Sequence, residues 1–514
     1  MRLSEIISLV GADTALVGGR LNGGDAIDIT GLSIDSRELK GKDLSGNVLF
    51  AALPGEHADG RSFAAEAVKM GAVCVLAEGP VHGIDAPQII VKDARAALSR
   101  ISDALYGHPS KRLRTIGVTG TNGKTTTTYL LESILNEAGS PGVMGTVNYR
   151  YKGLVFDAPH TTPEAHELQA TMARMADAGV THCVMEVSSH ALLQKRVNDV
   201  AFDAAVYTNL TPEHLDFHGT MERYFDAKSL LFKKLLKKKG ASIINIDCPW
   251  GRRLDAGLHN EAMRYSLLSH CADVYPLDYR LGPDSTEAEV MTPKGALSIV
   301  SGLVGEYNLY NTLAAVAASV ALGIDGTNIT RGVKNLKNVP GRLEKIVPEG
   351  VVRFIAYVDY AHTGDALERA ITALTRIKRG RIITVFGCGG NRDRTKRPKM
   401  GEISTRLSDI SIITSDNPRD EDPLEIIKEI EAGIKGVRRF SPEAEATEAG
   451  YAVIPERAEA IKKAVFLARD DDTILVAGKG HEDYQIVKGI KHHFSDFESL
   501  RGAIGEREKS ELKA

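Results

Sequence analysis

The stretch VTGTNGKTT places glycine, lysine and threonine in an order suited to binding phosphates. Gly120 and Gly123 allow the backbone to turn sharply, so that amide groups and the positive end of a following helix face phosphate oxygens. Lys124 can reach the β- and γ-phosphates of a nucleotide, and Thr125 can ligate Mg²⁺. Val118 stands where the strict G-x4-G-K-[ST] pattern has glycine, so the alternative is an ordinary turn between a strand and a helix. An apolar run before the stretch and a helical pattern after it favour the phosphate loop.

A second motif, SDNPRDED at residues 415–422, holds one arginine among four acids. It follows an apolar run at 409–414 that predicts a buried strand, and Pro418 stiffens the turn. Arg419 can pair with a carboxylate and the acids can receive an ammonium, so the loop is suited to a small zwitterion. The alternative is the N-terminal loop of a helix, whose dipole favours acids in the first turn. That alternative explains the last three acids but not Arg419.

Both motifs need strands that position them. Apolar runs and periodic segments alternate along the chain, which is typical of parallel sheets with helices on both faces. In such sheets ligands bind beyond the carboxyl ends of the strands, where the 415–422 turn falls. The predicted strands are 48–52, 72–76, 115–118, 182–187, 204–207, 354–358, 382–386, 410–414 and 473–476. The predicted helices are 63–70, a helix from 124, 222–236, 365–377 and 457–468.

Length and pattern breaks predict three domains. A chain of 514 residues suggests about three units of ordinary size. The segment YGHPS at 106–110 resembles a linker, and VPG at 339–341 ends the second block. We expect an N-terminal α/β domain at residues 1–110, a central phosphate-loop domain with a parallel sheet at 111–340, and a C-terminal Rossmann-like domain at 341–514.

Composition excludes several classes of protein. A hydrophobic fraction of 43% and a charged fraction of 25% are ordinary for a globular protein, and the net charge of −3 argues against nucleic-acid binding. The five cysteines are scattered and form no CxxC pair, which argues against a disulfide framework or a zinc site. The longest mildly apolar run, 313–324, is too short for membrane insertion, and the N-terminus lacks the features of a signal peptide. We expect a cytoplasmic protein.

A series of motifs, taken in order, resembles those of the Mur ligases, which build the peptide of bacterial peptidoglycan. The resemblance covers nearly the whole chain, and the order and spacing of the motifs make it specific. It is strongest to the members that add the third residue to UDP-N-acetylmuramoyl-L-alanyl-D-glutamate. The motifs are TGTNGKT, HTTPE (160–164), MEVSSH (185–190), TNLTPEHLDFHG (208–219), GEYNLYN (305–311), PGRLE (340–344), DYAHTGDAL (359–367), FGCGGNRDRTKRP (386–398), DNPR (416–419) and AGKGHEDYQ (477–485).

The resemblance implies an ATP-dependent amide ligase that works through an acyl phosphate and uses two Mg²⁺ ions. The catalytic residues that it implies are Lys124, Lys228 and His214. The metal ligands that it implies are Thr125, Glu186, His214 and Lys228, the last as N6-carboxylysine, a carbamate formed with CO₂. Without the resemblance, Lys228 would be an exposed helical lysine, Glu186 a surface acid at a strand end and His214 a structural histidine.

The same resemblance implies the nucleotide contacts. The base and ribose are expected to be held by Asn308 and Asn311, which share one helix face, and by Arg342 and Asp359. Gly364 stands where the family usually has proline, which loosens the turn after Asp359. The phosphate-loop contacts are Gly120, Thr121, Asn122, Gly123, Lys124, Thr125 and Thr126.

The substrates that the resemblance implies are UDP-muramoyl-dipeptide and meso-diaminopimelate. Members that add diaminopimelate carry DNPR, whereas members that add lysine lack the arginine, so Arg419 is expected to pair with the far carboxylate. The UDP contacts would be Ile34, Ser36, Glu56, His57 and Ala58. The dipeptide contacts would be His160, Thr161, Thr162, Ser188, Gln194 and Arg196. The diaminopimelate contacts would be Arg392, Asp416, Asn417, Pro418, Arg419, Gly478 and Glu482, with Asp416 and Asn417 receiving the far ammonium.

Three alternatives stay open at this point. The first alternative is a Mur ligase that adds L-lysine. The second is a folylpolyglutamate-type ligase that extends a γ-glutamyl chain, and the third is a P-loop switch in which nucleotide orders loops for a protein partner. The second alternative would lack a UDP-binding first domain and the DNPR motif. The third predicts slow hydrolysis that does not depend on an acceptor. We expect a monomer with small-molecule substrates.

Overall fold

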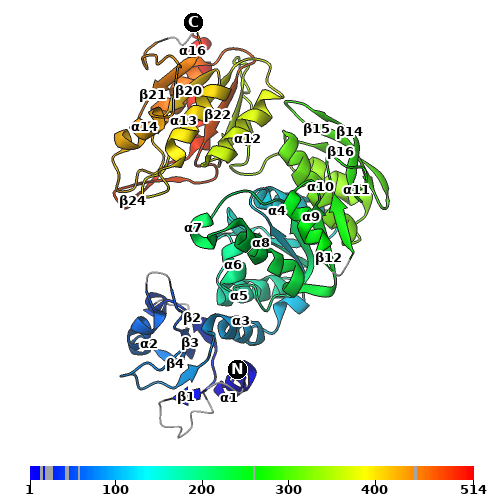
Figure 1. Cartoon of the computed structure of the whole chain (residues 1–514), viewed down its shortest axis with the longest axis vertical. Coiled ribbons are helices and arrows are strands. Elements are labelled where there is room, and N and C mark those ends of the chain that lie inside the picture. Colours follow the sequence, from blue (N-terminus) through cyan, green and yellow to red (C-terminus); the bar gives the residue numbers. More distant parts are fainter. Residues whose placement is uncertain are drawn as a thin grey trace. The chain divides into compact units, whose positions relative to one another are not determined.

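The computed structural model describes residues 1–11, 15–17, 27–40, 46–55, 58–258, 261–444 and 448–513 (Figure 1). The fold is mixed α/β, as the sequence predicts. None of the helices in this described part is long and apolar enough to cross a membrane. The chain divides into a first unit of Met1–Tyr275, Thr292–Lys294 and Leu313–Ile329, and a second unit of Pro276–Met291, Gly295–Thr312 and Thr330–Ala514. The domain bounds expected at residues 110 and 340 stay predictions.

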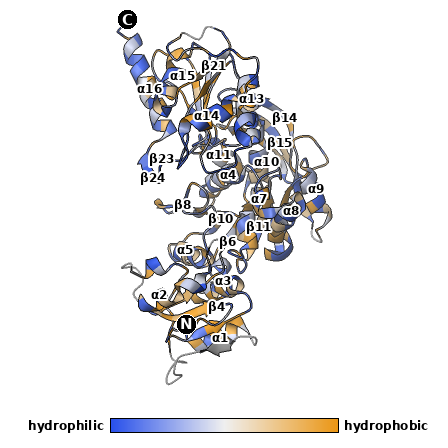
Figure 2. Cartoon of the chain, turned by 60° about the vertical axis from the view of Figure 1, so that its left-hand side comes forward, coloured by the Kyte–Doolittle hydropathy of each residue, from blue (hydrophilic) through white to orange (hydrophobic). Residues whose placement is uncertain are grey.

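The N-terminal part of the first unit is a five-stranded sheet in the order β1-β5-β4-β3-β2. Its elements are α1 (Leu3–Val10), β1 (Ala15–Val17), β2 (Gly31–Ser33), the 3₁₀ helix η2 (Ser36–Lys40), β3 (Val48–Ala51), the 3₁₀ helix η3 (Gly60–Phe63), α2 (Ala64–Lys69), β4 (Ala72–Ala77), β5 (Gln88–Ile90), α3 (Ala94–Leu105) and the 3₁₀ helix η4 (Pro109–Lys111). The strands are parallel except for β1. Along β4, coloured as hydrophobic in Figure 2, Cys74 and Leu76 pack into one core cluster, and Val75 and Ala77 into another. Both faces of the sheet are therefore covered.

The central part of the first unit is an eight-stranded sheet in the order β13-β12-β11-β6-β10-β7-β8-β9. Its elements are β6 (Arg114–Thr119), α4 (Lys124–Asn136), β7 (Pro141–Met144), β8 (Asn148–Tyr151), β9 (Leu154–Asp157), α5 (Ala165–Asp177), β10 (His182–Glu186), α6 (Ser189–Leu193), β11 (Phe202–Tyr207), α7 (Leu215–His218), α8 (Met221–Leu230), the π-helix η5 (Leu231–Leu235), β12 (Leu236–Asn245), α9 (Pro249–Ala256) and β13 (Ala262–Tyr265). The strands from β13 to β7 are parallel, and β8 and β9 extend the sheet as an antiparallel hairpin. The strands predicted in this region are confirmed as β6, β10 and β11.

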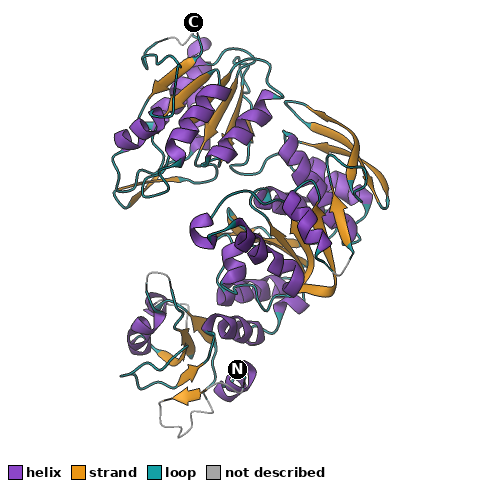
Figure 3. Ribbon diagram, in the orientation of Figure 1, coloured by secondary structure: helices purple, strands orange, loops and turns teal. Residues whose placement is uncertain are grey.

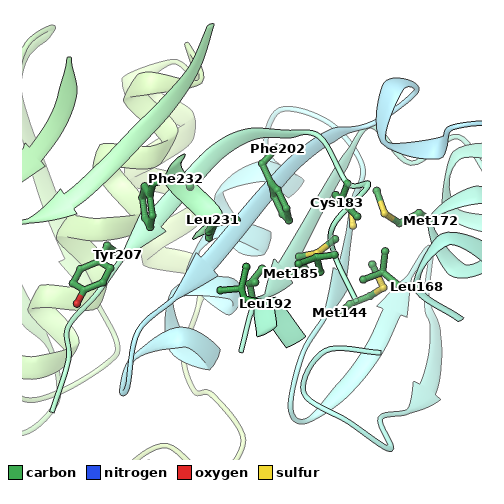
Figure 4. Close-up of a cluster of buried hydrophobic side chains, with 14 of the residues drawn as sticks. Met144, Leu168, Met172, Cys183, Met185, Leu192, Phe202, Tyr207, Leu231 and Phe232 are labelled. Atoms are coloured by element: carbon green, nitrogen blue, oxygen red, sulfur yellow. The ribbon is translucent and has the colours of Figure 1, made fainter. Parts of the chain in front are cut away.

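Methionines and leucines fill the core on one face of this sheet (Figure 4). Leu168 and Met172 of α5 belong to the same buried cluster as Cys183 and Met185 of β10. Since successive strand residues face opposite sides, the next residue after Met185 points to the other face. The core thus fixes β10 so that the charged group at its carboxyl end, Glu186, lies on the face away from this cluster.

The second unit contains a six-stranded sheet in the order β17-β18-β22-β19-β20-β21, parallel except for β17. Its elements are β17 (Glu344–Ile346), β18 (Ile355–Asp359), α12 (Gly364–Thr375), β19 (Ile382–Phe386), α13 (Lys396–Leu407), β20 (Ile410–Ile413), α14 (Pro423–Glu431), β21 (Gly450–Val453), α15 (Arg457–Leu467), β22 (Thr473–Ala477), β23 (Tyr484–Val487), β24 (Ile490–His493) and α16 (Asp496–Glu511). One core cluster contains α12, α13 and α14, and a second contains α15 and α16, so helices cover both faces (Figure 3). The predicted doubly wound arrangement is confirmed.

Between the central and C-terminal sheets the chain forms elements that the sequence analysis did not predict. They are a three-stranded sheet, β14 (Tyr275–Leu281), β15 (Thr286–Thr292) and β16 (Gly295–Ser301), and the helices α10 (Glu306–Ala321) and α11 (Gly326–Asn335). The strand β15 alternates buried and exposed residues in the sequence TEAEVMT. Such a strand carries too few apolar residues to be recognised as an apolar run.

A buried ion pair joins the first turns of α15 and α16. The Arg457 guanidinium donates to both carboxylate oxygens of Asp496 at 2.7 Å, and neither side chain is exposed. On the surface of the same two helices, Lys462 and Glu506 form an ion pair at 2.6 Å, with side chains 44% and 58% exposed.

We expect Arg457→Met to lower the free energy of unfolding of the C-terminal sheet by about 3–5 kcal/mol, because it leaves a buried carboxylate without its partner. The matched variant Lys462→Met should cost less than about 1 kcal/mol, because its pair is screened by solvent. Urea unfolding followed by circular dichroism measures both. Equal losses for the two variants would contradict the assignment of Arg457 as the stabilising partner.

Candidate active site

The phosphate loop connects the carboxyl end of β6 to the first turn of α4. Gly120 has a φ of +148° and Gly123 a φ of +87°, conformations that other residues rarely adopt. A Cβ atom at Gly120 would lie 1.9 Å from the hydroxyl oxygen of Thr208. Both glycines are therefore required by the backbone, and the strand–loop–helix context that the sequence predicts is confirmed.

The segment after β11 holds this loop in place. Thr208 Oγ1 donates to the Asn122 carbonyl oxygen at 2.6 Å, and the Thr121 amide donates to the Asn209 carbonyl oxygen at 2.9 Å. The Asn122 amide donates to Asn209 Oδ1 at 3.0 Å. Because β6 and β11 are parallel neighbours, their carboxyl ends bring the motif TNLTPEH beside the phosphate loop.

The Glu186 carboxylate meets the first turn of α4. Its Oε2 accepts from Thr125 Oγ1 at 3.2 Å and from Thr146 Oγ1 at 3.0 Å, and its Oε1 accepts from the Thr146 amide at 2.8 Å. Glu186 is 1% exposed, so the alternative of a surface acid is wrong. Thr146 comes from the turn between β7 and β8, and the sequence analysis gave no sign of its role.

Two lysines converge on one carbonyl oxygen of the phosphate loop. Lys124 Nζ donates to the carbonyl oxygens of Gly120 and Thr121 at 3.0 and 2.9 Å, and Lys228 Nζ donates to that of Gly120 at 2.9 Å. Lys228 lies on α8 and is 1% exposed, so the alternative of an exposed helical lysine is wrong. Burial, and after it the charge of Lys124, hold the pKa of Lys228 well below its ordinary value.

His214 belongs to a group of aromatic rings beside Lys228. The His214 ring lies edge-on to that of His190, with centroids 5.0 Å apart, and to that of Tyr224, at 6.3 Å. Lys228 Nζ lies 4.7 Å from the centroid of the Tyr224 ring. Burial lowers the pKa of His214 and of His190, and lowers the pKa of His218 to about 4, which favours the neutral form of each imidazole. The sequence analysis missed His190 and His218.

The oxygen atoms of Glu186 and Thr125 suit a hard cation whose remaining ligands are phosphate and water oxygens. Among the residues placed by the structure, no group of three or more His, Cys, Asp or Glu side chains could hold a metal ion. Glu186 and Thr125 offer one carboxylate and one hydroxyl oxygen, the set that suits Mg²⁺ when substrate phosphates supply further ligands. The assignment of a second ion to His214 and Lys228 stays a prediction.

Thr162 links the residues expected to bind the dipeptide. Its hydroxyl donates to the Glu186 carbonyl oxygen at 2.8 Å and accepts from the Ser188 amide at 3.1 Å. Arg196 donates to the Thr162 carbonyl oxygen at 2.9 Å and to Gln194 Oε1 at 2.7 Å. The structure thus brings these residues together at the carboxyl end of β10.

The neighbouring residues add an ion pair that the sequence analysis did not predict. Arg196 pairs with Glu164 at 2.7 Å, with both side chains mostly buried. Thr161 Oγ1 lies 3.1 Å from Thr146 Oγ1, and the His160 carbonyl oxygen accepts from a tyrosine hydroxyl at 2.5 Å. Thr146 therefore connects the motif HTTPE to the Glu186 carboxylate, since its hydroxyl contacts both Thr161 and Glu186.

Of the residues expected to bind UDP, Ile34 and Ser36 follow β2, and Ala58 follows β3. Ser36 is buried, and its hydroxyl donates to Glu66 Oε2 at 3.3 Å. Ile34 is half-buried and Ala58 is exposed. Their roles stay predictions. Outside the described residues lie Glu56 and His57.

In the second unit, Asp359 ends β18 and anchors the backbone around it. Its carboxylate accepts from the Leu343 amide at 2.7 Å and the Ala361 amide at 2.9 Å. Burial raises the pKa of Asp359, and the nearby charge of Arg342 opposes that rise. The Arg342 guanidinium also lies 5.0 Å from the centroid of the Tyr360 ring. Arg342 and Asp359 are therefore close together, as the sequence analysis expects.

The two asparagines of α10 share a face of the helix, as predicted. Asn311 Nδ2 donates to Asn308 Oδ1 at 3.1 Å, and Asn308 Nδ2 donates to the Val304 carbonyl oxygen at 2.9 Å. Gly364 is the first residue of α12, and Thr363 Oγ1 caps that helix by accepting from the Ala366 amide at 3.3 Å. The turn after β18 is therefore an ordinary capped helix start, despite the glycine.

The 415–422 loop packs against the segment that follows β22. Asn417 Nδ2 donates to Glu482 Oε2 at 3.1 Å. Arg419 has a φ of +53°, and its amide donates to the Ile486 carbonyl oxygen at 3.0 Å. The Arg419 guanidinium donates to the Gly390 carbonyl oxygen at 2.7 Å. The backbone and the side chain of Arg419 are thus both fixed.

Most of the residues expected to bind diaminopimelate surround this loop. A Cβ atom at Gly478 would lie 3.6 Å from Asp416 Oδ2, and Pro418 is buried beside them. Arg392 is exposed on the adjacent loop. The sequence analysis missed Lys479, whose Nζ lies 3.3 Å from Asp416 Oδ1.

The alternative explanation of the 415–422 loop places the acids after Arg419 in the first turn of a helix, where the helix dipole favours them. The structure shows different contacts for Asp422 and Glu421. Asp422 caps α14 by accepting from the Leu424 amide at 2.8 Å. Glu421 precedes the helix and instead pairs with the buried Arg397 at 2.9 Å, which holds the pKa of Glu421 at about 2. That alternative is therefore wrong for Glu421, which joins the loop to α13.

The fold and the first site define a P-loop nucleotide-binding enzyme built on parallel sheets. Three segments match family models: "Mur ligase family, catalytic domain" at residues 28–106, "Mur ligase middle domain" at 118–319 and "Mur ligase, glutamate ligase domain" at 341–480. The chain belongs to the Mur ligase family, and like its relatives it is an ATP-dependent ligase.

Individual relatives match over nearly the full length. A UDP-N-acetylmuramoyl-L-alanyl-D-glutamate--2,6-diaminopimelate ligase of Geobacter metallireducens is 45% identical, over 98% of this chain and 99% of its own. A protein of the same name from Gloeobacter violaceus is also 45% identical, over 99% of each chain. A solved structure with that name has a TM-score of 0.68 and 32% identity, over 99% of each chain.

Proposed function

We propose that this chain joins meso-diaminopimelate to the D-glutamate carboxylate of UDP-N-acetylmuramoyl-L-alanyl-D-glutamate, in the synthesis of peptidoglycan precursors. ATP transfers its γ-phosphoryl group to the carboxylate, which gives an acyl phosphate and ADP. The neutral amine of diaminopimelate then attacks the acyl carbon, and phosphate leaves. The observation that carries the acceptor is the 415–422 loop, where Arg419 offers a cation and Asp416 and Glu482 offer acids to a zwitterion. Relatives that bear this activity in their names support it.

Each residue of the first site has a role in bringing two anions together. The loop amides, the N-terminus of α4 and Lys124 bind and orient the triphosphate. Glu186 and Thr125 would hold Mg²⁺, which neutralises phosphate charge and polarises the γ-phosphoryl group. Thr162, Ser188 and Arg196 orient the muramoyl-dipeptide, because a carboxylate reacts only when held close to the transferred group.

We propose further that Lys228 carries a carbamate. Burial lowers the pKa of its amine and so favours the neutral form, and a neutral amine adds to CO₂ with loss of one proton. The product is an anion with two oxygens, which is suited to a second Mg²⁺ together with His214. The change also removes the repulsion between Lys228 and Lys124, which share the Gly120 carbonyl oxygen.

The remaining parts of the proposal follow from the family. The N-terminal domain at 1–110 binds UDP, the central domain at 111–340 binds ATP, and the domain at 341–514 binds the amino acid. The nucleotide base and ribose contact Asn308, Asn311, Arg342 and Asp359. The enzyme acts as a monomer in the cytoplasm, where nucleotide precursors are made. Gel filtration with light scattering tests the oligomeric state.

Purified enzyme with ATP, Mg²⁺ and UDP-muramoyl-dipeptide should release phosphate only when meso-diaminopimelate is added. Mass spectrometry of the lengthened nucleotide peptide measures the reaction, with L-lysine offered in parallel. Preference for lysine would support the lysine-adding alternative. Phosphate release without any acceptor would support a P-loop switch, and failure to bind a uridine nucleotide would support a folylpolyglutamate-type ligase.

Arg419→Ala should lower kcat/KM for diaminopimelate about 10²-fold or more, because the far carboxylate loses its partly buried, charged partner. The KM for ATP should stay unchanged. The matched variant is Arg394→Ala, which removes an exposed arginine paired with Glu429 in the same domain. Steady-state kinetics compares the two variants, and wild-type turnover by Arg419→Ala would rule out this role.

Enzyme incubated with ¹³C-bicarbonate should give a carbamate carbon signal by NMR, and Lys228→Met should lack it. Lys124→Met is the matched control, because its lysine belongs to the same site and should leave the signal in place. A wild-type spectrum without the signal, in active enzyme, would contradict the carbamate.

A further inference from the structure

Lys479 is a fully buried cation that the proposed mechanism does not yet use. It lies in the segment after β22, and its side chain is 0% exposed. Its Nζ donates to Asn417 Oδ1 at 3.1 Å and to the Tyr484 carbonyl oxygen at 2.7 Å, and lies 3.3 Å from Asp416 Oδ1. An ammonium has three donors and no acceptor; two hydrogen bonds of Lys479 go to Asn417 and Tyr484, and Asp416 Oδ1 lies within ion-pair distance. Lys479 therefore ties together the two residues that begin the DNPR motif.

The contacts of Lys479 fix which way the Asn417 amide points. Asn417 Oδ1 accepts from Lys479 Nζ and from the Ile486 amide, the latter at 2.9 Å. Both partners can only donate, so the atom that faces them must be the oxygen. The amino group Nδ2 is thereby turned to Glu482 Oε2, at 3.1 Å. Asn417 therefore offers a donor to the Glu482 side of the loop, and its oxygen is already engaged.

Lys479 also balances charge in this loop. Asp416 is 7% exposed, and its Oδ1 has no hydrogen bond among the described residues, although the Lys479 ammonium is within ion-pair distance. Burial, and then the charge of Asp416, raise the pKa of Glu482, while Lys479 lowers it. Two buried acids close together would repel each other without a cation. Lys479 places a positive charge beside Asp416 and so compensates part of the acidic charge of this loop.

We propose that Lys479 is a positioning residue that sets the specificity for the acceptor amino acid. It orients Asn417 so that its amino group joins Arg419 as a donor to the far carboxylate. Asp416 and Glu482 are then left to receive the far ammonium. This replaces the role expected from the sequence, in which Asn417 receives the ammonium. The inference rests on the proposed function, since it concerns the same acceptor site.

Lys479→Met removes one of the two donors that hold the Asn417 oxygen and leaves only the Ile486 amide, so the orientation of the Asn417 amide is less firmly held. We expect the ratio of kcat/KM for meso-diaminopimelate to kcat/KM for L-lysine to fall about tenfold or more. The KM for ATP and for UDP-muramoyl-dipeptide should stay within about twofold of the wild type, because none of the residues expected to bind those ligands belongs to this loop. The matched control is Lys378→Met, whose lysine pairs with Asp409 at 3.0 Å in the same domain and should leave the ratio unchanged.

A second variant keeps the test decisive if Lys479→Met folds poorly. Asn417→Asp retains an oxygen for Lys479 and Ile486 but replaces the amino group with a second oxygen. It should lower the same ratio with Lys479 intact. A role for Lys479 in stability alone predicts a different result: lower melting temperature and lower kcat for both acceptors, with an unchanged ratio. That result, or an unchanged ratio in Asn417→Asp, would overturn the inference.

Thermal unfolding separates this inference from the proposed function. The single variants Lys479→Met and Asp416→Asn and their double variant form a cycle that needs no ligand. If the two residues form a stabilising ion pair, the melting temperature of the double variant falls by less than the sum of the two single decreases. A decrease equal to that sum would overturn the ion pair. If the wild type uses neither acceptor, the proposed function fails and the specificity role falls with it, whatever the cycle gives.

Discussion

Two lysine amines, those of Lys124 and Lys228, donate to one carbonyl oxygen, that of Gly120, and the phosphate site depends on this convergence. The convergence requires a glycine, because a side chain there would collide with the Thr208 hydroxyl that also holds the loop. It brings like charges together in a buried place, which is unfavourable unless anions are near or one amine loses its proton. The site is therefore built for anions: triphosphate, the carboxylate of a substrate and, in our proposal, a carbamate on Lys228.

The 415–422 loop in the second unit is built on the same principle with the signs exchanged. Acids gather there, and buried cations fix them: Lys479 beside Asp416, and Arg397 beside Glu421. Breaking one partner of such a pair leaves an uncompensated buried charge, so each pair restricts the loop to one arrangement. A loop held in this way can recognise both ends of a zwitterion without first having to be ordered by it.

Most strands of the parallel sheets, and the motifs at their carboxyl ends, could be predicted from the sequence. The contacts between motifs could not. Parallel strands such as β6, β19 and β22 are continuous apolar runs because both of their faces are buried. A motif that follows such a run must lie at the carboxyl edge of a sheet. Thr146, by contrast, reaches Glu186 across forty residues of chain, and no local pattern encodes that distance. The strand β15 was missed because it alternates buried and exposed residues and forms no continuous apolar run.

The buried charges differ in how far the sequence could have revealed them. Lys228 follows Tyr224 by four residues on α8, and both are buried, so the helical period alone places the lysine on the apolar face. Read that way, Lys228 is a charge at a position where the pattern predicts core, and such a charge has a functional or pairing reason. Lys479 lies in a loop, which has no helical or strand repeat from which burial could be predicted. Only the fold, by setting the end of β22 beside the DNPR turn, brings that lysine to the proposed acceptor site.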